Sequence, residues 1–347
     1  MTNRLLEDDE VKQKVLELFA TMSKTEIAEQ VGVDRRRIGE FLRKRTYPEW
    51  WESKGAEDVP QSIDTTPSKV FTKKGVVGVL GIQTSKYAPS GGTHVMIPDT
   101  QVKPNIDMSW LDWVGEFLAS KKPDVIIHIG DHFDLPSLSS YDKGTKKAEG
   151  KHLHDDIQAG IEGMNRLLKP IYDLQQKELQ EFGEVRYKPK MVFTLGNHEQ
   201  RLERHINANP ELTDLVSYSD FRLEEFGWEV YDFLEPAIVN GVMYIHYLPN
   251  PMTGRPYGGS ALNVLNKIGC SASMGHVQKL DIATKNVANG QAQWLIVCGA
   301  CYPHKEGYKG YIGNHHFRGL VVKHGVDKGN YNPMIVDLDY LERKYAN

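Results

Sequence analysis

Side chains that commonly bind metal ions follow five short apolar runs of this sequence, directly after each run ends. In chain order they are Asp99, Asp131, Asn197, His246 and His276. One such residue would mean little, because a buried histidine is more often a hydrogen-bonded core residue than a ligand. Five in succession predict a metal centre that is assembled where buried strands end.

A phosphoester-cleaving centre with two metal ions would explain these residue types. Two divalent cations about 4 Å apart need a carboxylate between them to offset their repulsion, and they can then hold a phosphate and activate a bridging water as the nucleophile. Asp131 has the right chemistry for the bridging position. His198 and Asp134 suit the proton donor for the leaving group, because a histidine held by a carboxylate works near neutral pH.

Two arginines follow this block. Arg201 and Arg204 lie on the stretch after Asn197, where they could neutralise phosphate oxygens. A solvated helix face explains them equally well, so the sequence leaves both interpretations open.

The elements that would position these residues alternate between strands and helices. Short β-rich apolar runs end in Gly, Pro or a polar residue, at HVMIP, DVIIHIG, MVFTLG, GVMYIHY, ASMGH and QWLIVCG. Helical periodicity near 109–120 and 155–182 separates them. The pattern predicts an α/β core with buried strands.

The order of these motifs resembles the calcineurin-like metallophosphoesterase superfamily, whose pattern runs D-x-H, G-D-x-x-D, G-N-H-[DE], a lone H and then G-H-x-H. The resemblance covers about residues 93–280 and implies a β-sandwich flanked by helices. It also implies two divalent ions bridged by Asp131, one of them completed by Asn197, His246 and His276. His198 would then be the general acid or a phosphate contact.

The second ion would be bound by Asp99, Asp131 and positions 101 and 278. The family has histidine at both of these positions, whereas this chain has Gln101 and Gln278. Amide oxygens would make this site all-oxygen, which favours Mg²⁺ or Mn²⁺ over Zn²⁺ or Fe. A degenerate, inactive site is the alternative interpretation.

The N-terminal region has the pattern of a helix-turn-helix. Gly32 permits a turn between two predicted helices, and Asp34 can cap the second one. Arg35, Arg36 and Arg37 would then lie where a recognition helix meets DNA. A small three-helix bundle that binds protein, with its arginines merely solvated, is the alternative.

The sequence therefore divides into three parts. Residues 1–46 form the predicted all-α helix-turn-helix domain, 47–92 a linker and entry loop, and 93–347 the catalytic domain. Within the last part, residues 305–333 interleave Tyr, His, Lys and Gly. This mixture fits either contact with a phosphate-rich substrate or a plain surface loop.

The composition is that of a soluble globular protein. The 42 basic and 46 acidic residues give a net charge of −4, so no general positive coat attracts nucleic acid. No apolar run of about 18 residues could span a bilayer, and the N-terminus does not resemble a secretion signal. We expect no membrane partner and a cytoplasmic location, with Cys270, Cys298 and Cys301 unpaired.

A basic helix-turn-helix tethered to a phosphodiester-cleaving centre would concentrate DNA at the active site. We therefore expect a DNA nuclease with DNA as its partner, and any protein partner is unknown. The domain architecture suggests that a phage encodes it. Two other functions stay open. One is a phosphomonoesterase or a protein or nucleotide phosphatase, and the other is a DNA-binding protein with a vestigial metal site.

Overall fold

The structure, a computed structural model, describes four continuous stretches of the chain and three single residues. These are 81–141, 144–288, 290–306 and 314–346, with Lys14, Gln30 and Val31. The chain divides into two units, Met1–Thr65 and Thr66–Asn347, and the four stretches all belong to the second. The predicted helix-turn-helix, with its arginines at 35–37, lies outside the described residues and stays a prediction.

One β-sheet has six strands among the described residues, in the order β11-β10-β1-β2-β3-β4. Their bounds are β1 Gly92–Ile97, β2 Val125–His128, β3 Lys190–Thr194, β4 Glu229–Tyr231, β10 Gly319–Asp327 and β11 Asn330–Asp337. The pairs β1/β2, β2/β3 and β3/β4 are parallel, whereas β10 is antiparallel to both of its neighbours. The carboxyl ends of β1, β2 and β3 therefore lie side by side.

A second sheet has five strands among the described residues, in the order β5-β6-β7-β9-β8. Their bounds are β5 Ala237–Val239, β6 Val242–Tyr244, β7 Ala272–Met274, β8 Leu280–Asn286 and β9 Ala292–Cys298. Here too three neighbouring strands, β6, β7 and β9, are parallel. Each sheet thus presents a set of adjacent strand ends on which polar side chains can gather.

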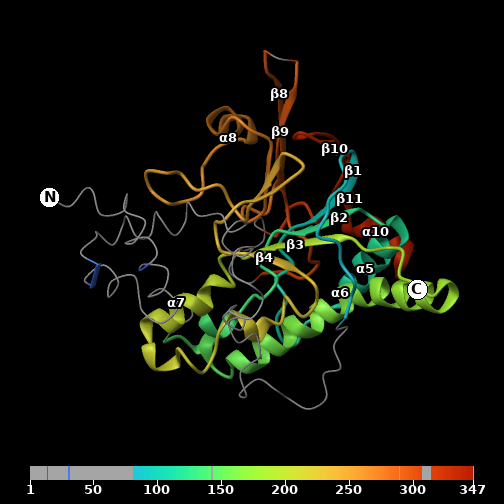
Figure 1. The fold of residues 1–347 in the computed structure, drawn as a ribbon. Helices are drawn as coiled ribbons and strands as arrows, with labels where there is room; N and C mark the ends of the chain where they lie inside the picture. The colour runs from blue at the N-terminus through green and yellow to red at the C-terminus, as the bar shows by residue number, and fades with distance from the viewer. Residues whose placement is uncertain are drawn as a thin grey trace. The chain divides into compact units, whose positions relative to one another are not determined.

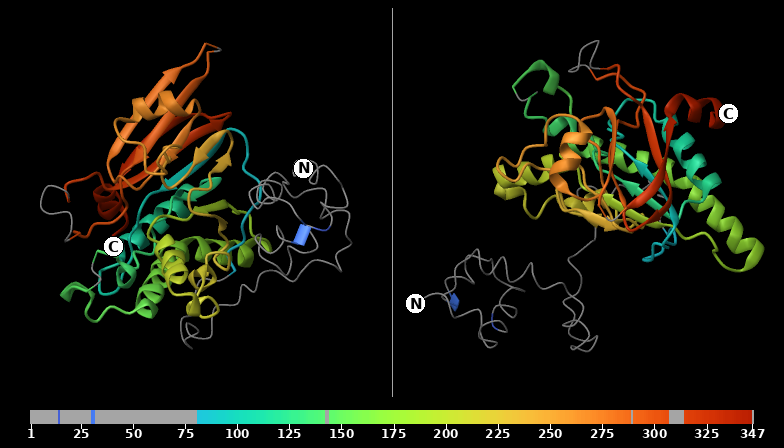
Figure 2. Two further views of the ribbon diagram at one scale, coloured as in Figure 1. Left: turned by 90° about the vertical axis from the view of Figure 1, so that its left-hand side faces the viewer. Right: turned by 90° about the horizontal axis from the view of Figure 1, so that it is seen from above.

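Helices cover the outer faces of the two sheets (Figures 1 and 2). The helices are α5 Ser109–Lys121, α6 Leu153–Phe182, α7 Gln200–Ala208, α8 Ala261–Ile268 and α10 Leu338–Tyr345, with short 3-10 helices η1 Pro136–Leu138, η2 Lys146–Ala148, η3 Pro210–Leu212 and η4 Tyr218–Phe221. Along β2, Ile127 packs between the sheets, while its neighbour Ile126 packs on the side of Trp110 from α5. Leu265 of α8 packs with Leu295 on the second sheet.

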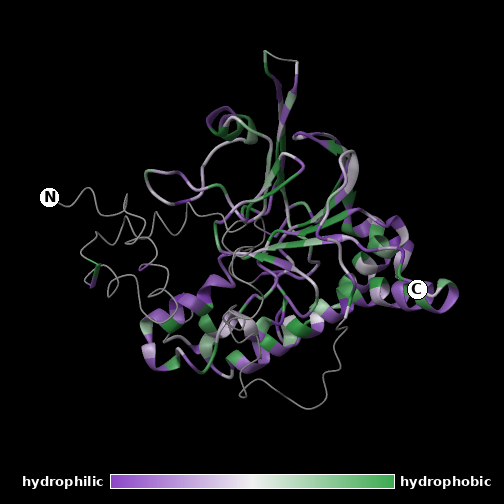
Figure 3. Cartoon of the chain, viewed as in Figure 1, coloured by the Kyte–Doolittle hydropathy of each residue, from purple (hydrophilic) through white to green (hydrophobic). Residues whose placement is uncertain are grey.

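This arrangement of two sheets between helices confirms the predicted metallophosphoesterase-type sandwich. Alternate residues of β2 face opposite layers and all are buried, which explains why its sequence is an unbroken apolar run. Figure 3 shows the same contrast, with hydrophobic central strands and helices that carry hydrophilic residues on their outer side. Among the described residues, none of the helices has the length and apolar character that crossing a membrane requires.

The prediction for residues 305–333 was partly wrong. Residues 319–327 form β10, next to the edge strand β11 of the first sheet, and Lys323 is fully buried there rather than presented to a substrate. Its Nζ donates to the Ser273 hydroxyl at 2.6 Å and lies 4.1 Å from the Tyr244 ring centre. Burial lowers the pKa of Lys323 to about 7.

A glycine in α6 lets the helix approach the loop that follows β2. A Cβ atom at Gly160 would collide with the ring of Phe133, which is fully buried and stacked on Phe221 with ring centres 4.2 Å apart. The carbonyl of Gly160 also accepts a hydrogen bond from His132 Nε2 at 2.9 Å. Close contact at Gly160 therefore holds this loop against α6.

We expect Gly160→Ala to destabilise the protein by about 1–3 kcal/mol, because the overpacked ring must move. The loss should appear although alanine is favoured over glycine inside a helix by roughly 1 kcal/mol. Urea unfolding measures this. Gly258→Ala, at an exposed glycine with open space around it, is the control and should shift stability by less than about 0.5 kcal/mol. A stability of Gly160→Ala equal to wild type would contradict the argument.

Candidate metal centre

Five predicted ligands occupy loops at the adjacent strand ends. Asp99, Asp131 and Asn197 follow β1, β2 and β3, and His246 and His276 follow β6 and β7 of the other sheet. Hydrogen bonds join the two groups. The backbone N–H of His276 donates to Asp99 Oδ1 at 3.0 Å, and His246 Nδ1 lies 2.8 Å from the carbonyl oxygen of residue 129. Both sheets therefore contribute to one site.

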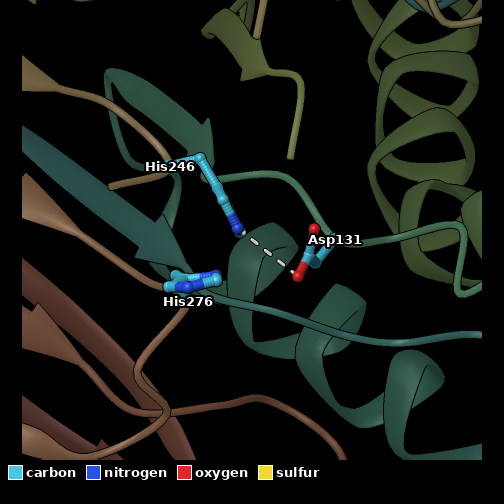
Figure 4. A group of neighbouring side chains, drawn as sticks. All are labelled: Asp131, His246 and His276. Carbon is cyan, nitrogen blue, oxygen red and sulfur yellow. Dashed lines mark ion pairs between the residues drawn. The ribbon is translucent and has the colours of Figure 1, made fainter. Parts of the chain in front are cut away.

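Three of these side chains form a group that could hold a metal ion. One ligand atom from each of Asp131, His246 and His276 lies within 4.8 Å of the other two, and Figure 4 shows the three side chains facing one another. Asn197 Oδ1 joins them, at 2.9 Å from His246 Nε2 and 2.6 Å from His276 Nδ1. Because a backbone carbonyl only accepts, Nδ1 of His246 carries a proton, so Nε2 is the nitrogen that a metal ion would bind.

Further oxygen donors come from the loop that follows β1. Asp99 is fully buried, and the backbone N–H of Gln101 donates to the Asp131 carbonyl at 2.8 Å. The side-chain oxygen of Gln101 is buried and has no hydrogen-bond partner among the described residues. Such an atom costs about 1–3 kcal/mol unless something satisfies it. A hard cation bound by Asp99, Asp131 and Gln101 would do so.

The charges in the site also favour cations. Burial and the charge of Asp131 raise the pKa of Asp99. Burial alone would raise the pKa of Asp131, but His198 and His246 hold it well below its usual range. Burial would lower the pKa of His246, but the charge of Asp131 raises it to about 9. Burial and the charge of His246 lower the pKa of His276 to about 4. Two buried carboxylates with so few cationic partners suit bound divalent ions.

The backbone is strained at the predicted ligands. Four of them have positive φ: Gln101 at 42°, Asp131 at 52°, His276 at 63° and Gln278 at 58°. Each costs of order 1 kcal/mol or more for a residue other than glycine, and such strain gathers at functional sites because the surroundings enforce it.

The glycines of the motifs permit close approach of the loops. A Cβ atom at Gly196 would collide with the carboxylate of Asp131, and one at Gly275 would collide with that of Asp99. The glycine before Asn197 and the one before His276 are therefore needed for the neighbouring ligand to fit.

Glu199 holds two ligand loops together, a role that the sequence analysis missed. Its Oε1 accepts the backbone N–H groups of His132 and Phe133 at 2.7 and 2.9 Å, and its Oε2 accepts those of Asp131 and Gly196, both at 2.8 Å. The only signal in the sequence was its place as the fourth residue of the G-N-H-E block.

The predicted pair of His198 and Asp134 is in contact. His198 Nδ1 lies 2.7 Å from Asp134 Oδ1, and His198 Nε2 lies 3.7 Å from Asp131 Oδ2. Burial would lower the pKa of His198, but the charges of Asp131 and Asp134 raise it. Burial would raise the pKa of Asp134, but its hydrogen bond with His198 lowers it to about 2. The pair can therefore hold a proton beside the metal ligands.

Arg201 lies against this pair and not on a solvated helix face. Its guanidinium donates to the Asp134 carbonyl at 2.6 Å and lies 3.1 Å from His198 Nε2. Arg204 is exposed and donates to the Asn197 carbonyl at 3.1 Å. Whether either arginine contacts substrate stays a prediction.

Further polar residues behind the site escaped the sequence analysis. Thr100 Oγ1 lies 3.2 Å from His128 Nε2 and 2.8 Å from His132 Nδ1, and all three side chains are fully buried. Lys103 Nζ lies 3.4 Å from Asp134 Oδ2 and 2.6 Å from Glu306 Oε1. These contacts join segments far apart in the sequence, which no local pattern reveals.

The cysteines form no disulfide. All three are free thiols, with Cys298 and Cys301 buried, and burial raises the pKa of Cys301 to about 12. A protonated buried thiol behaves as a small hydrophobic side chain.

Comparison with known proteins identifies the family. The model of the calcineurin-like phosphoesterases matches residues 97–328, which is more than half of the chain. This chain belongs to the calcineurin-like phosphoesterase family. Two phage proteins are also similar: the Gene 54 protein of Mycobacterium phage L5, 26% identical over 207 residues, and that of Mycobacterium phage D29, 25% identical over 209 residues. Each match covers 58% of this chain and 75% of the relative.

Membership of the calcineurin-like phosphoesterase family implies metal-dependent hydrolysis of phosphoesters. The group of Asp131, His246 and His276 is where the structure provides for a metal ion. The phage origin of both relatives agrees with the expected source.

We expect Glu199→Gln to destabilise the protein by roughly 3 kcal/mol or more, because either amide orientation turns an NH₂ group toward two backbone N–H donors and leaves them without an acceptor. Guanidinium unfolding in EDTA measures the loss without a metal contribution. Glu203→Gln, at an exposed glutamate in α7, is the matched control and should be nearly neutral. Equal effects of the two substitutions would refute the role of Glu199.

Proposed function

We propose that this calcineurin-like phosphoesterase is a DNA nuclease that uses two divalent ions, Mn²⁺ or Mg²⁺. The observation that supports phosphodiester cleavage is the placement of His198 and Asp134 beside the Asp131, His246 and His276 group. Support for DNA as the substrate comes from the sequence, through the basic helix-turn-helix. The two phage relatives are consistent with a phage protein.

The residues of the chain divide the chemical work. Bound divalent ions would neutralise the phosphate and activate water. Asn197, His246 and His276 would hold one ion, and Asp99 with Gln101 the other. Asp131 would contribute to both sites.

His198 would donate the proton to the leaving oxygen. Asp134 fixes its Nδ1 side at 2.7 Å, so that its Nε2 faces the side of Asp131. Arg201 would restrain the Asp134 side of the pair through its hydrogen bond to the Asp134 carbonyl. Arg204 is exposed in the middle of α7 and would contact a phosphate of the bound strand.

The N-terminal arginines would hold DNA near this centre. A second binding module on a tether raises the effective concentration of substrate, a gain that a small-molecule phosphatase would not obtain. We accordingly propose DNA as the partner and a cytoplasmic location.

A second candidate is a protein with a vestigial metal site. The observation that favours it is the replacement of two family histidines by Gln101 and Gln278. A phosphomonoesterase has no comparable support from the described residues.

We expect Mn²⁺-dependent digestion of DNA, tested on linear and circular, single-stranded and double-stranded substrates. His198→Ala should lower the rate by about 10²- to 10⁴-fold, the usual contribution of a general acid. Parallel assays with bis(p-nitrophenyl) phosphate and p-nitrophenyl phosphate separate diesterase from monoesterase activity. Equal inactivity of wild type and His198→Ala on all four DNA substrates would refute the nuclease, and a preference for the monoester would favour a phosphatase.

We expect the combined variant Arg35→Ala, Arg36→Ala and Arg37→Ala to bind DNA more weakly. If all three contact phosphates, the slope of log K against log salt should fall in magnitude by about 3. Fluorescence anisotropy over a salt series measures this, and cleavage of bis(p-nitrophenyl) phosphate should not change. The triple Lys variant keeps the charge and should keep the slope. An unchanged slope in the Ala variant would exclude this surface as the DNA contact.

A further inference from the structure

The two glutamines that replace family histidines have opposite hydrogen-bonding states. The side-chain oxygen of Gln101 is buried without a partner among the described residues. Both ends of the Gln278 amide are occupied, because Nε2 donates to Asp99 Oδ2 at 3.0 Å and Oε1 accepts from the Tyr302 hydroxyl at 2.8 Å. The amide oxygen of Gln101 is therefore available to a metal ion, whereas that of Gln278 is held by Tyr302.

The partners of Gln278 determine which way its amide points. An ionised carboxylate only accepts hydrogen bonds, so the NH₂ group must face Asp99. The amide oxygen then faces Tyr302, whose hydroxyl donates. Turning the amide round would bring its oxygen against the Asp99 carboxylate and would remove the donor that Gln278 gives to Asp99 Oδ2.

Tyr302 is itself held rigidly. It follows β9, the third parallel strand of the second sheet, and its side chain is fully buried. Its ring is stacked on His304 with centres 4.4 Å apart and planes inclined by 23°. A fixed tyrosine imposes one orientation on a neighbouring amide, as second-sphere partners of metal ligands do.

We propose that Gln278 is not a metal ligand but a hydrogen-bond donor that positions Asp99, and that Tyr302 holds it in this role. The second ion would then have three protein ligands, all through oxygen: Asp99, Asp131 and Gln101. With fewer ligands than its nitrogen-bearing neighbour, this site binds a hard cation weakly and leaves positions open to substrate oxygens. The proposal concerns the metal centre of the family and does not depend on DNA being the substrate.

The test is a titration of the full-length, EDTA-treated protein with Mn²⁺, in which electron paramagnetic resonance measures the free ion. Wild type should show one tight and one weak site. With an ion bound to Asp99, the repulsion between that carboxylate and an amide oxygen is removed, and only the Tyr302 hydroxyl keeps the Gln278 oxygen turned away from the ion. In Tyr302→Phe the weak site should therefore tighten by about 10-fold, the lower end of the effect of second-sphere partners. This gain should disappear in the double variant Tyr302→Phe, Gln278→Leu. Gln101→Leu should weaken the same site strongly.

Several results would overturn the proposal. If Gln278 already binds the ion with support from Tyr302, Tyr302→Phe will weaken the site. An unchanged affinity in Tyr302→Phe, a gain that survives in the double variant, or a single Mn²⁺ site in the wild type would also contradict it. Thermal unfolding in EDTA shows which variants fold, and Gln101→Leu provides a second test that does not require Tyr302 to be changed. Loss of DNA cleavage alone would bear on the nuclease and not on this proposal.

Discussion

The candidate centre depends on the carboxylate of Glu199, which receives four backbone N–H groups from two different loops. One loop follows β2 and carries Asp131, and the other follows β3 and carries Asn197 and His198. Among the described residues, no main-chain hydrogen bond joins these two loops, and the buried carboxylate of Glu199 links them instead. The backbone N–H of His198 then donates to Asp131 at 2.9 Å, which makes the two loops one rigid unit.

The second constraint is charge. Asp99 and Asp131 are buried in one site, and the backbone at Asp131 and at Gln101 adopts a strained conformation. Burying carboxylates without cations is unfavourable, so the fold itself makes a place for divalent ions. The two sides differ in chemistry. Histidine nitrogens and the Asn197 oxygen gather at one place, whereas the second ion that we propose would be bound through carboxylate and amide oxygens, so the centre would be asymmetric.

Much of this could be predicted from the sequence because the relevant signals are local. Buried strands are unbroken apolar runs, and the runs before Asp99, Asp131, Asn197, His246 and His276 correspond to β1, β2, β3, β6 and β7. Prediction failed at β10, where Gly, His and Lys gave the appearance of a loop. The reason is that Lys323 is accommodated inside the core by Ser273 and Tyr244, which come from distant strands of the other sheet.

The residues that could bind metal, and their order along the chain, can be read from the amino-acid sequence, since ligand type and position after a strand are properties of short segments. What each polar atom faces depends on the folded chain. The Arg201 guanidinium contacts Asp134 and does not point toward solvent, Glu199 links two loops, and the side-chain oxygen of Gln278 accepts a hydrogen bond from Tyr302. Hydrogen bonds are directional and here join residues far apart in the chain, so these roles exist only once the two sheets have met.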